Sequence, residues 1–285
     1  MRFLILGCNG MAGHMISLYL KERGHDVVGL ARKDLGLVKT VVGDITDINL
    51  LREVITNRHF DTIVNCVGIL NQNAERNKAE AVFINSYIPH FLADIAKEED
   101  SYLIHMSTDC VFSGSRGSYT EEDFKDGTTF YDRTKALGEI EDDKNVTIRS
   151  SIVGPDLNPN GIGLLNWFMN QNEPINGFTK AIWTGQTTLQ YAKTVEAVAK
   201  ERIHGIYNLV PDSSISKYEL LQLFNHYLRN DKMTINPSSS FICDKSLKCT
   251  KFDFDYKVPD YEKMISEMTE WMKRHKELYP HYKLG

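Results

Sequence analysis

The sequence predicts an α/β fold with a doubly wound parallel sheet, followed by a smaller and less regular C-terminal region. Three observations support this. Short apolar runs alternate with longer helical patterns through the first half, and those runs are almost wholly apolar, as in strands that helices cover on both faces. A glycine-rich turn directly follows the first run. Right-handed crossovers then favour the doubly wound arrangement, in which ligands bind at the carboxyl ends of the strands.

The elements of the first half follow one another regularly. Strands are predicted at 3–6, 26–30, 40–42, 62–67, 102–106 and 146–148, with helices including 15–23 and 48–55 between them.

After Gly154-Pro155 the regularity ends. Residues 156–161 and 236–240 are typical of turn-rich loops, helices are predicted at 164–169, 189–200, 217–229 and 261–275, and one further strand at 205–209. We therefore expect a first domain over 1–153 and a second region over 154–285 that is partly interleaved with it.

Composition excludes several classes of protein. The 285 residues are 42% hydrophobic and 25% charged, as in ordinary globular proteins, and the net charge of −5 gives no reason to expect nucleic acid or a membrane surface as a partner. The first apolar run is too short for a signal peptide or a membrane span. Five cysteines form no CxxC pair and no metal-ligand spacing, so we expect core-filling thiols and a cytoplasmic protein.

The turn Gly7-Cys8-Asn9-Gly10-Met11-Ala12-Gly13 lies between the first strand and a helix. Glycines there let the backbone approach a pyrophosphate, toward which the amides at the start of the helix point. The spacing differs from the Gly-x-Gly-x-x-Gly of many dehydrogenases, and a structural turn is the alternative. The position of the turn nevertheless predicts a dinucleotide site in a Rossmann domain over 1–153.

The end of the second strand indicates which dinucleotide binds. NAD-specific sites carry an acidic residue there, whereas this chain has Arg32 and Lys33, so we expect NADPH, with NADH possible. The alternative is that both cations belong to a solvated loop. Asp44 and Ile45 could contact the adenine, although Asp44 could instead cap the helix at 48–55.

Tyr131 and Lys135 are one helical turn apart and could supply a proton to a reduced carbonyl. A free phenol has a pKa near 10. A neighbouring ammonium would lower the phenol pKa, so we expect Lys135 to lower that of Tyr131. Thr108, at the end of a predicted strand, could bond the carbonyl oxygen, with Ser107 as a neighbouring candidate.

Taken together, these residues resemble those of the extended short-chain dehydrogenase/reductases, in the dTDP-4-dehydrorhamnose reductase-like branch. The resemblance rests on the glycine turn, Asn65-Cys66-Val67-Gly68, Asn85, Ser107–Phe112 and the Tyr131/Lys135 pair. It implies that Thr108, Tyr131 and Lys135 are catalytic. The residues that it and the motifs place at the cofactor are Gly7, Asn9, Gly10, Met11, Gly13, Arg32, Asp44, Ile45, Cys66, Val67, Gly68, Asn85 and Ser151.

Residues 64–69, 107–114, 176–181 and 244–247 are more specifically similar to bacterial reductases of UDP-N-acetyl-6-deoxy-L-hexosamine pathways, which serve surface polysaccharides. Two departures from the rhamnose branch are Cys110, where Tyr is usual, and Asp132, where Gly is usual. They weaken any assignment to dTDP-rhamnose itself. The resemblance allows a homodimer, and we expect no essential metal.

The run 177–188 mixes aromatic, cationic and hydroxyl groups, which suits a sugar nucleotide. Within it we expect Lys180 to bind phosphate and Trp183 or Thr187 to contact the sugar. Ser107 and Asp109 are further substrate candidates, and 244–246 would close the pocket. The histidines show no metal-ligand spacing and are expected to be solvated or ordinary core residues.

The function expected is NADPH-dependent reduction of the C4 ketone of a nucleotide-linked 4-keto-6-deoxyhexose, of UDP-N-acetylhexosamine or dTDP-rhamnose type. An epimerase that uses the same Tyr and Lys is an alternative. A dehydratase would ordinarily add an acidic pair beside Thr108, where only Asp109 is present. A non-catalytic NADP-binding regulatory subunit is a further alternative from a different class.

Overall fold

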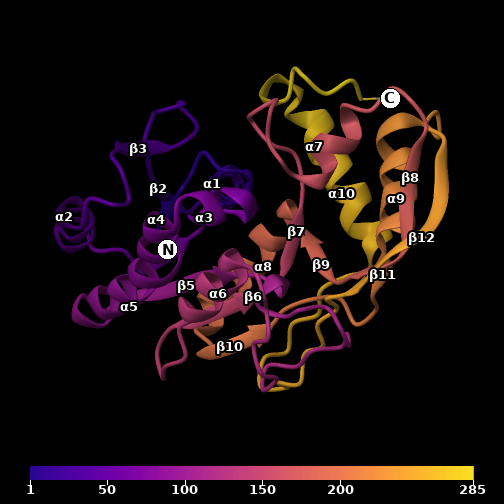
Figure 1. Ribbon diagram of the computed structural model, residues 1–285. Coiled ribbons are helices and arrows are strands. Elements are labelled where there is room, and N and C mark those ends of the chain that lie inside the picture. The colour runs from indigo at the N-terminus through magenta and orange to yellow at the C-terminus, as the bar shows by residue number, and fades with distance from the viewer. Residues whose placement is uncertain (285) are drawn as a thin grey trace.

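The larger sheet, described with the rest of residues 1–284 in a computed structural model, has seven strands that run parallel to their neighbours. They are β1 (Arg2–Leu6), β2 (Asp26–Ala31), β3 (Lys39–Val42), β4 (Thr62–Asn65), β5 (Tyr102–Ser107), β6 (Val146–Arg149) and β10 (Gly205–Asn208). Their spatial order is β10-β6-β5-β4-β1-β2-β3 (Figure 1). The chain direction across the sheet reverses between β1 and β4, which confirms the predicted doubly wound arrangement and places a ligand crevice at that point.

Successive side chains of β1 point to opposite faces of the sheet and join different cores. Phe3 and Ile5 pack with α1 and α8, whereas Leu4 and Leu6 pack with α2 and α5. These helices are α1 (Met11–Glu22), α2 (Ile48–Arg58), α5 (Ile88–Glu98) and α8 (Thr188–Glu201). Apolar residues on both faces explain why the strands have no alternating polar pattern.

Short helices cover the carboxyl edge of the sheet. They are α3 (Asn71–Arg76), α4 (Lys78–Val82), the π-helical turn Phe83–Tyr87, the 3-10 turn Asp109–Val111 and α6 (Phe130–Leu137). A Cβ at Gly138 would collide with the carbonyl oxygen of Asn85, so the end of α6 packs directly on the π-helical turn.

The second region contains a three-stranded sheet in the order β11-β8-β12 and a two-stranded sheet of β7 and β9. The strands are β7 (Ser151–Val153), β8 (Ile175–Trp183), β9 (Gly185–Thr187), β11 (Ile215–Ser216) and β12 (Ile235–Asp244), and the helices α7 (Leu164–Met169), α9 (Lys217–Arg229) and α10 (Tyr261–Arg274). A 3-10 turn follows at Lys276–Leu278.

The expectation of a loop at 236–240 was wrong, because these residues lie in β12. Pro237 is tolerated because β12 is an edge strand, where a missing N–H interrupts no ladder on the outer side. The register shift between Ser238 and Ile242 accommodates the polar residues between them.

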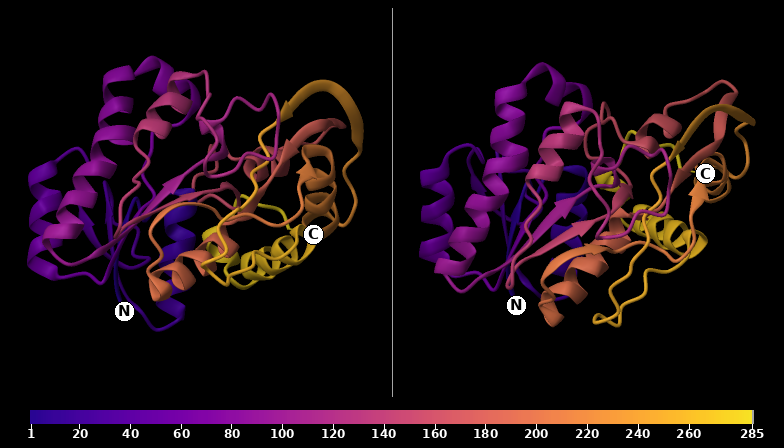
Figure 2. Two further views of the ribbon diagram at one scale, coloured as in Figure 1. Left: turned by 90° about the horizontal axis from the view of Figure 1, so that it is seen from below. Right: turned by 60° about the horizontal axis from the view of Figure 1, so that its bottom comes forward.

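The two regions are interleaved. Strand β10 and helix α8 come from beyond residue 153 but belong to the larger sheet and its covering layer, while β8, β12, α9 and α10 form a separate body beside it (Figures 1 and 2). Within residues 1–284 no helix is both long and apolar enough to span a bilayer.

Candidate active site

The turn after β1 brings backbone groups close together. Gly7 has a φ of +78°, which side chains disfavour, and a Cβ there would lie 2.8 Å from Cγ2 of Val67. A Cβ at Gly13 would collide with the carbonyl oxygen of Gly7, so α1 starts directly against the turn. Gly10 caps α1 without a side-chain hydrogen bond, which leaves the first amides available to an anion. The predicted glycines therefore form a cradle that fits a pyrophosphate.

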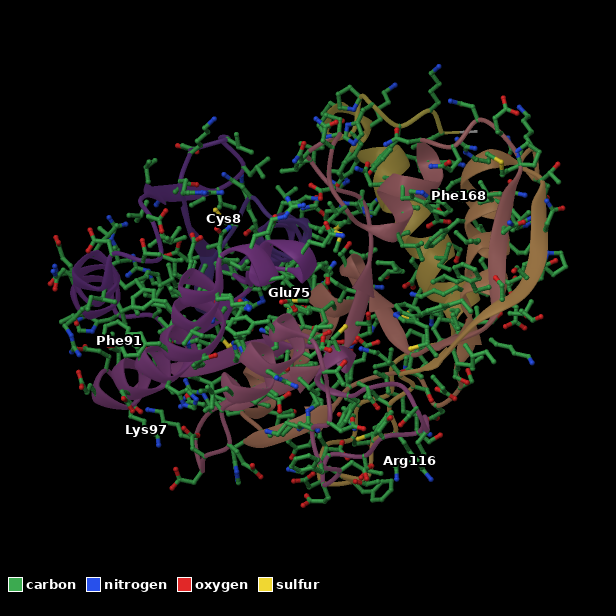
Figure 3. The ribbon with its side chains drawn as sticks, in the orientation of Figure 1. Cys8, Glu75, Phe91, Lys97, Arg116 and Phe168 are labelled. Atoms are coloured by element: carbon green, nitrogen blue, oxygen red, sulfur yellow. The ribbon has the colours of Figure 1, made fainter. Side chains whose placement is uncertain are left out.

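The other residues of this turn attach it to its surroundings. Asn9 Nδ2 donates to the carbonyl oxygen of Lys33 at 2.7 Å. Cys8, labelled in Figure 3, is buried against β2, where a Cβ at Gly29 would collide with its thiol. Met11 Sδ lies close to the backbone of Gly163. The turn is thus fixed to β2 on one side and to the segment before α7 on the other.

Arg32 and Lys33 lie exposed at the end of β2. Asp44 Oδ1 accepts the N–H of Thr46 at 2.9 Å and its O–H at 2.8 Å. These bonds, with a smaller contribution from the charge of Arg32, lower the pKa of Asp44. The cation and the carboxylate predicted to hold the adenosine end therefore lie near one another.

The predicted alternative role of Asp44 as a helix cap was wrong. Asp47 is the N-cap of α2 and accepts the N–H of Leu50 at 3.0 Å. Asp44 instead accepts the N–H of Thr46, in the turn that precedes the cap. Ile45 is buried in the core that α2 shares with the sheet. Its contact with a cofactor stays a prediction.

Asn85 is fully buried and holds the loop that follows β4. Its Oδ1 accepts the N–H of Ile69 at 2.8 Å, and its Nδ2 donates to the Ile69 carbonyl at 2.9 Å and to the Thr134 hydroxyl at 3.1 Å. Gly68 lies beside this clamp, where a Cβ would be 3.3 Å from Asn85 Oδ1. Because these polar groups bond within the protein, Asn85 shapes the loop that carries Cys66 and Val67.

Ser107 points away from the substrate side of the sheet edge. Its hydroxyl donates to Glu139 Oε1 at 2.7 Å. Glu139 also receives two bonds from the fully buried Arg149, each 2.8 Å, and pairs with Lys125 at 3.0 Å. Burial alone would raise the pKa of Glu139, but these donors lower it overall. Ser107 therefore belongs to a buried ion network under the site.

Thr108 occupies the position predicted for it, directly after β5. It caps the 3-10 turn Asp109–Val111, and its Oγ1 accepts the N–H of Cys110 at 3.1 Å and donates to Asp109 Oδ1 at 3.1 Å. The Thr108 side chain is also near enough to Tyr131 to lower the pKa of the phenol. Thr108 and Tyr131 are 23 positions apart in the sequence and lie near one another at the edge of the sheet.

The start of α6 is held by three polar groups. Thr129 and Asp132 form a capping box, with Thr129 Oγ1 accepting the N–H of Asp132 at 3.1 Å and Asp132 accepting the N–H of Thr129 at 3.1 Å. Glu75 of α3, labelled in Figure 3, accepts the N–H of Phe130 at 2.7 Å. Asp132, the departure from the family's glycine, therefore fixes the helix that presents Tyr131.

Tyr131 is buried, and its pKa is raised well above the ordinary value. Burial is the main cause, followed by the Cys110 thiol and the Asp109 carboxyl. Thr108 lowers it, whereas Lys135 is not among the main influences, so the expectation that Lys135 lowers the pKa of Tyr131 was wrong. The phenol accordingly remains protonated at neutral pH, the state from which it can donate a proton.

Lys135 is buried beneath the end of β5. Its Nζ donates to the carbonyl oxygen of Met106 at 2.7 Å and lies 3.4 Å from Nε2 of His105. Burial lowers the pKa of Lys135 to about 8, although Glu139 and Cys66 act to raise it. The ammonium is thus turned toward β5, one helical turn from Tyr131 along the same helix.

A cavity of about 480 Å³ lies between this edge and the second region. Its walls come from the 3-10 turn after β5 and the start of β7 on one side, and from α7, β8, α9, β12 and the residue Lys245 beyond β12 on the other. The lining residues are Asp109, Cys110, Ser151, Leu164, Trp167, Asn176, Phe178, Ala181, Ile182, Trp183, Lys217, Leu221, Phe241, Cys243 and Lys245. The space is that of a small-molecule site.

Two lysines and one carboxylate dominate the charge of this cavity. Burial raises the pKa of Asp109, and the charges of Lys217 and Lys245 oppose that rise. Burial lowers the pKa of Lys217 to about 8 against the pull of Asp109, and its Nζ lies 4.6 Å from the centre of the Trp183 ring. With both lysines charged, the cavity carries a net positive charge.

The structure separates the predicted substrate residues into two groups. Trp183 and Asp109 line the cavity, together with Ser151, which was predicted to contact the cofactor. Lys180 is exposed on β8 outside the lining, and Thr187 is buried as the N-cap of α8, where it accepts the N–H of Gln190 at 3.2 Å. Lys245 lines the cavity within the segment 244–246 that was predicted to close it.

Sequence reasoning missed Lys217 and His105. Lys217 is the first residue of α9, a place where a lysine gives no recognisable pattern, and only the packing of α9 on β8 brings it to the cavity. His105 was predicted to be an ordinary core residue, but it touches Lys135. His105 lies two residues before Ser107 on β5, the strand that leads to the predicted site residues, and that position is the signal that could have identified it.

The described residues contain one further groove but no candidate metal site. A groove of about 660 Å³ between α8 and residues 253–256 contains none of the predicted site residues and mixes both charges. Among residues 1–284, no three His, Cys, Asp or Glu side chains are grouped to hold a metal ion.

Sequence comparison adds relatives to this geometry. The pattern of the RmlD substrate binding domain family matches residues 1–251. A dTDP-4-keto-6-deoxy-D-glucose reductase of Streptomyces niveus is 34% identical over 140 residues, which are 48% of this chain and 46% of that protein. This chain therefore spans about half the length of that relative.

Solved structures share the fold. A dTDP-4-dehydrorhamnose reductase of Bacillus anthracis in complex with NADP superposes with a TM-score of 0.80 at 21% identity, covering 95% of this chain and 99% of that one. The enzyme WbmG of Bordetella bronchiseptica, in complex with NAD and UDP, gives a TM-score of 0.77 at 16% identity and covers 96% of each chain.

Proposed function

Because the chain belongs to the RmlD substrate binding domain family, we propose that it is an NADPH-dependent reductase of nucleotide-linked 4-keto-6-deoxyhexoses. The observation that carries the proposal is that Thr108, Tyr131 and Lys135 all lie at the carboxyl edge of the sheet, beside a cavity of about 480 Å³. A regulatory subunit would need neither a buried phenol nor a positively charged cavity beside it.

The glycine turn is the part of the chain that fits a dinucleotide. Gly7, Gly10 and Gly13 leave room for the pyrophosphate, and the open start of α1 offers amides to it. Arg32 and Lys33, exposed at the end of β2, favour the extra phosphate of NADPH. When bound, the nicotinamide supplies the hydride.

The proton comes from the chain itself. Tyr131 stays protonated because its pKa is raised, and Thr108 lies beside it at the end of β5. Donation to the oxygen of the reduced ketone would leave a phenolate, which an ammonium one helical turn away stabilises. Lys135 supplies that charge when it is protonated, and the Met106 carbonyl accepts a hydrogen bond from its Nζ.

Lys217 and Lys245 replace Lys180 in our assignment of the phosphate-binding residues. Both line the cavity, and with Asp109 they leave it net positive, which suits a nucleoside diphosphate. The Bordetella neighbour holds UDP, and we propose a UDP- or dTDP-linked sugar here. The finer proposal is a UDP-N-acetylhexosamine derivative for surface polysaccharide, made in the cytoplasm.

The division of labour follows from this assignment. We propose that residues 1–153 bind the dinucleotide and that residues 154–285 mainly bind the substrate, with Ser151 at the boundary between them. A homodimer is part of the same proposal, through surfaces outside the cavity.

The test mixes purified protein with NADPH and a freshly generated UDP-4-keto-6-deoxy-N-acetylhexosamine or its dTDP-linked glucose counterpart. Stoichiometric loss of NADPH absorbance with formation of the reduced sugar supports the reductase. Conversion without net NADPH oxidation identifies an epimerase. NADPH binding with no conversion of either ketosugar contradicts the proposal and favours the regulatory role.

A further inference from the structure

His105 is fully buried in β5 and lies between two polar side chains of the site. Its Nδ1 is 3.2 Å from Nδ2 of Asn65, the last residue of β4, and its Nε2 is 3.4 Å from Nζ of Lys135. Neither contact was expected from the sequence. The ring therefore connects the loop after β4 with the lysine of the catalytic pair.

Hydrogen bonding around Asn65 assigns the tautomer of this ring. Asn65 Oδ1 accepts the backbone N–H of Val67 at 3.1 Å, so its amide nitrogen must be the atom that faces His105. An amide nitrogen can only donate, so Nδ1 of the ring accepts. Because burial lowers the pKa of His105 well below its ordinary value, the ring is neutral and its single proton lies on Nε2.

The Nε2–H consequently faces Lys135. A charged ammonium also carries only donors, so the two groups would oppose each other, whereas a neutral amine can accept the Nε2–H with its lone pair. The carbonyl oxygen of Met106 accepts an N–H from Lys135 in either state.

We propose that Asn65 and His105 form a fixed-tautomer relay that orients Lys135 and biases it toward the neutral amine in the ligand-free protein. His105 is then a positioning residue: it acts on proton transfer at Tyr131 only through Lys135. That last step rests on the proposed function, whereas the relay itself does not.

The other groups around Lys135 act in both directions. Glu139, beyond the end of α6, and Cys66, after β4, favour the ammonium, while burial disfavours it and lowers its pKa to about 8. The pull of Glu139 is weakened because Arg149 of β6 and Lys125 pair with it. On α5, His90 acts on His105 and further lowers its pKa. The relay adds a directional contact to this balance.

The test uses ligand-free protein and does not depend on turnover. Nitrogen-15 chemical shifts of His105 report its tautomer, and a carbon-13 titration of the lysine ε carbons, assigned with Lys135→Arg, reports the pKa of Lys135. We expect Nε2 to carry the proton in the unmodified protein. A proton on Nδ1 would overturn the proposal without any variant.

Asn65→Asp inverts the relay. The carboxylate still accepts the N–H of Val67 but can only accept from the ring, so Nδ1 becomes the donor and Nε2 turns its lone pair to the ammonium. The pKa of Lys135 should rise by about one unit or more. The new charge raises it as well, so the same substitution is made in a His105→Phe background, and only the excess over that background counts as the relay. Equal shifts in both backgrounds contradict the proposal.

Two further variants separate positioning from structure. His105→Gln offers an acceptor to Asn65 and a donor to Lys135, so the pKa of Lys135 should stay near its original value. His226→Gln, at an exposed position of α9, is the control and should change neither the tautomer nor the titration.

In the reductase assay, Asn65→Asp should shift the pH profile of kcat upward without changing the KM for NADPH, and a uniform loss at every pH would indicate a merely structural role. A relay that titrates as expected in a protein that reduces no ketosugar would leave the relay intact and remove only the proposed function.

Discussion

Polar side chains at the carboxyl edge of the large sheet differ in their bonding from those on the facing cavity wall. That wall is formed by β8, α9 and β12. At the edge, Ser107, Thr108 and Lys135 each have a hydrogen-bond partner inside the protein. On the facing wall, Lys217 and Lys245 have no salt-bridge partner within 4.0 Å among residues 1–284, although the charges of both act on Asp109. In the proposed function, the edge is the part preorganised for chemistry, and the wall supplies the charge that a ligand would neutralise.

Tyr131→Phe should have the largest effect, because it removes the proposed proton donor from the carboxyl edge of the sheet. We expect kcat to fall by about 10²–10⁴-fold, with the Kd for NADPH nearly unchanged. NADPH oxidation and a fluorescence titration measure the two. Retention of more than a tenth of the activity would show that the edge does not supply the proton.

Arg149→Met tests how much the buried Arg149–Glu139 ion pair contributes to the free energy of unfolding. The substitution leaves Glu139 buried without its main partner and should lower the free energy of unfolding by about 3–5 kcal/mol. Denaturant unfolding followed by circular dichroism gives the value. The double variant Arg149→Met with Glu139→Leu should be less destabilised, since no unpaired charge remains, and an equal or larger loss would argue against a paired role.

Lys217→Met probes the facing wall. It removes one of two charges assigned to the substrate phosphates and should raise the KM for the ketosugar by about 10–100-fold, at the scale of one charge-assisted contact of 1.5–3 kcal/mol, with little change in kcat. Lys180→Met is the matched control on the exposed side of β8 and should behave like the unmodified protein. Equal effects of the two would return the phosphate assignment to Lys180.

Arg32→Ala should give the smallest effect, confined to one end of the cofactor site. We expect the Kd for NADPH to rise by about tenfold, near 1.4 kcal/mol, while the Kd for NADH stays within twofold. Isothermal titration with both dinucleotides checks the difference. An equal loss for both would remove the argument for NADPH specificity.

These two regions also differ in how far the sequence predicts them. Each strand of the large sheet is a local apolar run with a turn after it, so the ends of β1, β2 and β5, and the residues placed there, followed from local pattern. The spacing of Tyr131 and Lys135 is likewise set by a single helix.

The cavity wall could not be predicted in the same way. Pro237 and the serines at 238–240 are typical of a loop, so the sequence does not reveal the register of β12. Lys217 reaches the cavity only through the packing of α9 on β8. Side-chain direction was a second limit. Ser107 and Lys180 have suitable chemistry but point elsewhere, and the Lys135 ammonium is directed to β5 by a carbonyl that no sequence motif records.

The helix that follows the glycine turn depends on a residue near the end of the chain. His14 in the first turn of α1 is fully buried, and its Nε2 shares a 2.8 Å hydrogen bond with the hydroxyl of Tyr279, a partner 265 residues further along the chain. During synthesis on the ribosome, the first helix therefore emerges long before the residue that seals it. Until translation has passed that tyrosine, the His14 ring at the start of α1 lacks this hydrogen-bond partner.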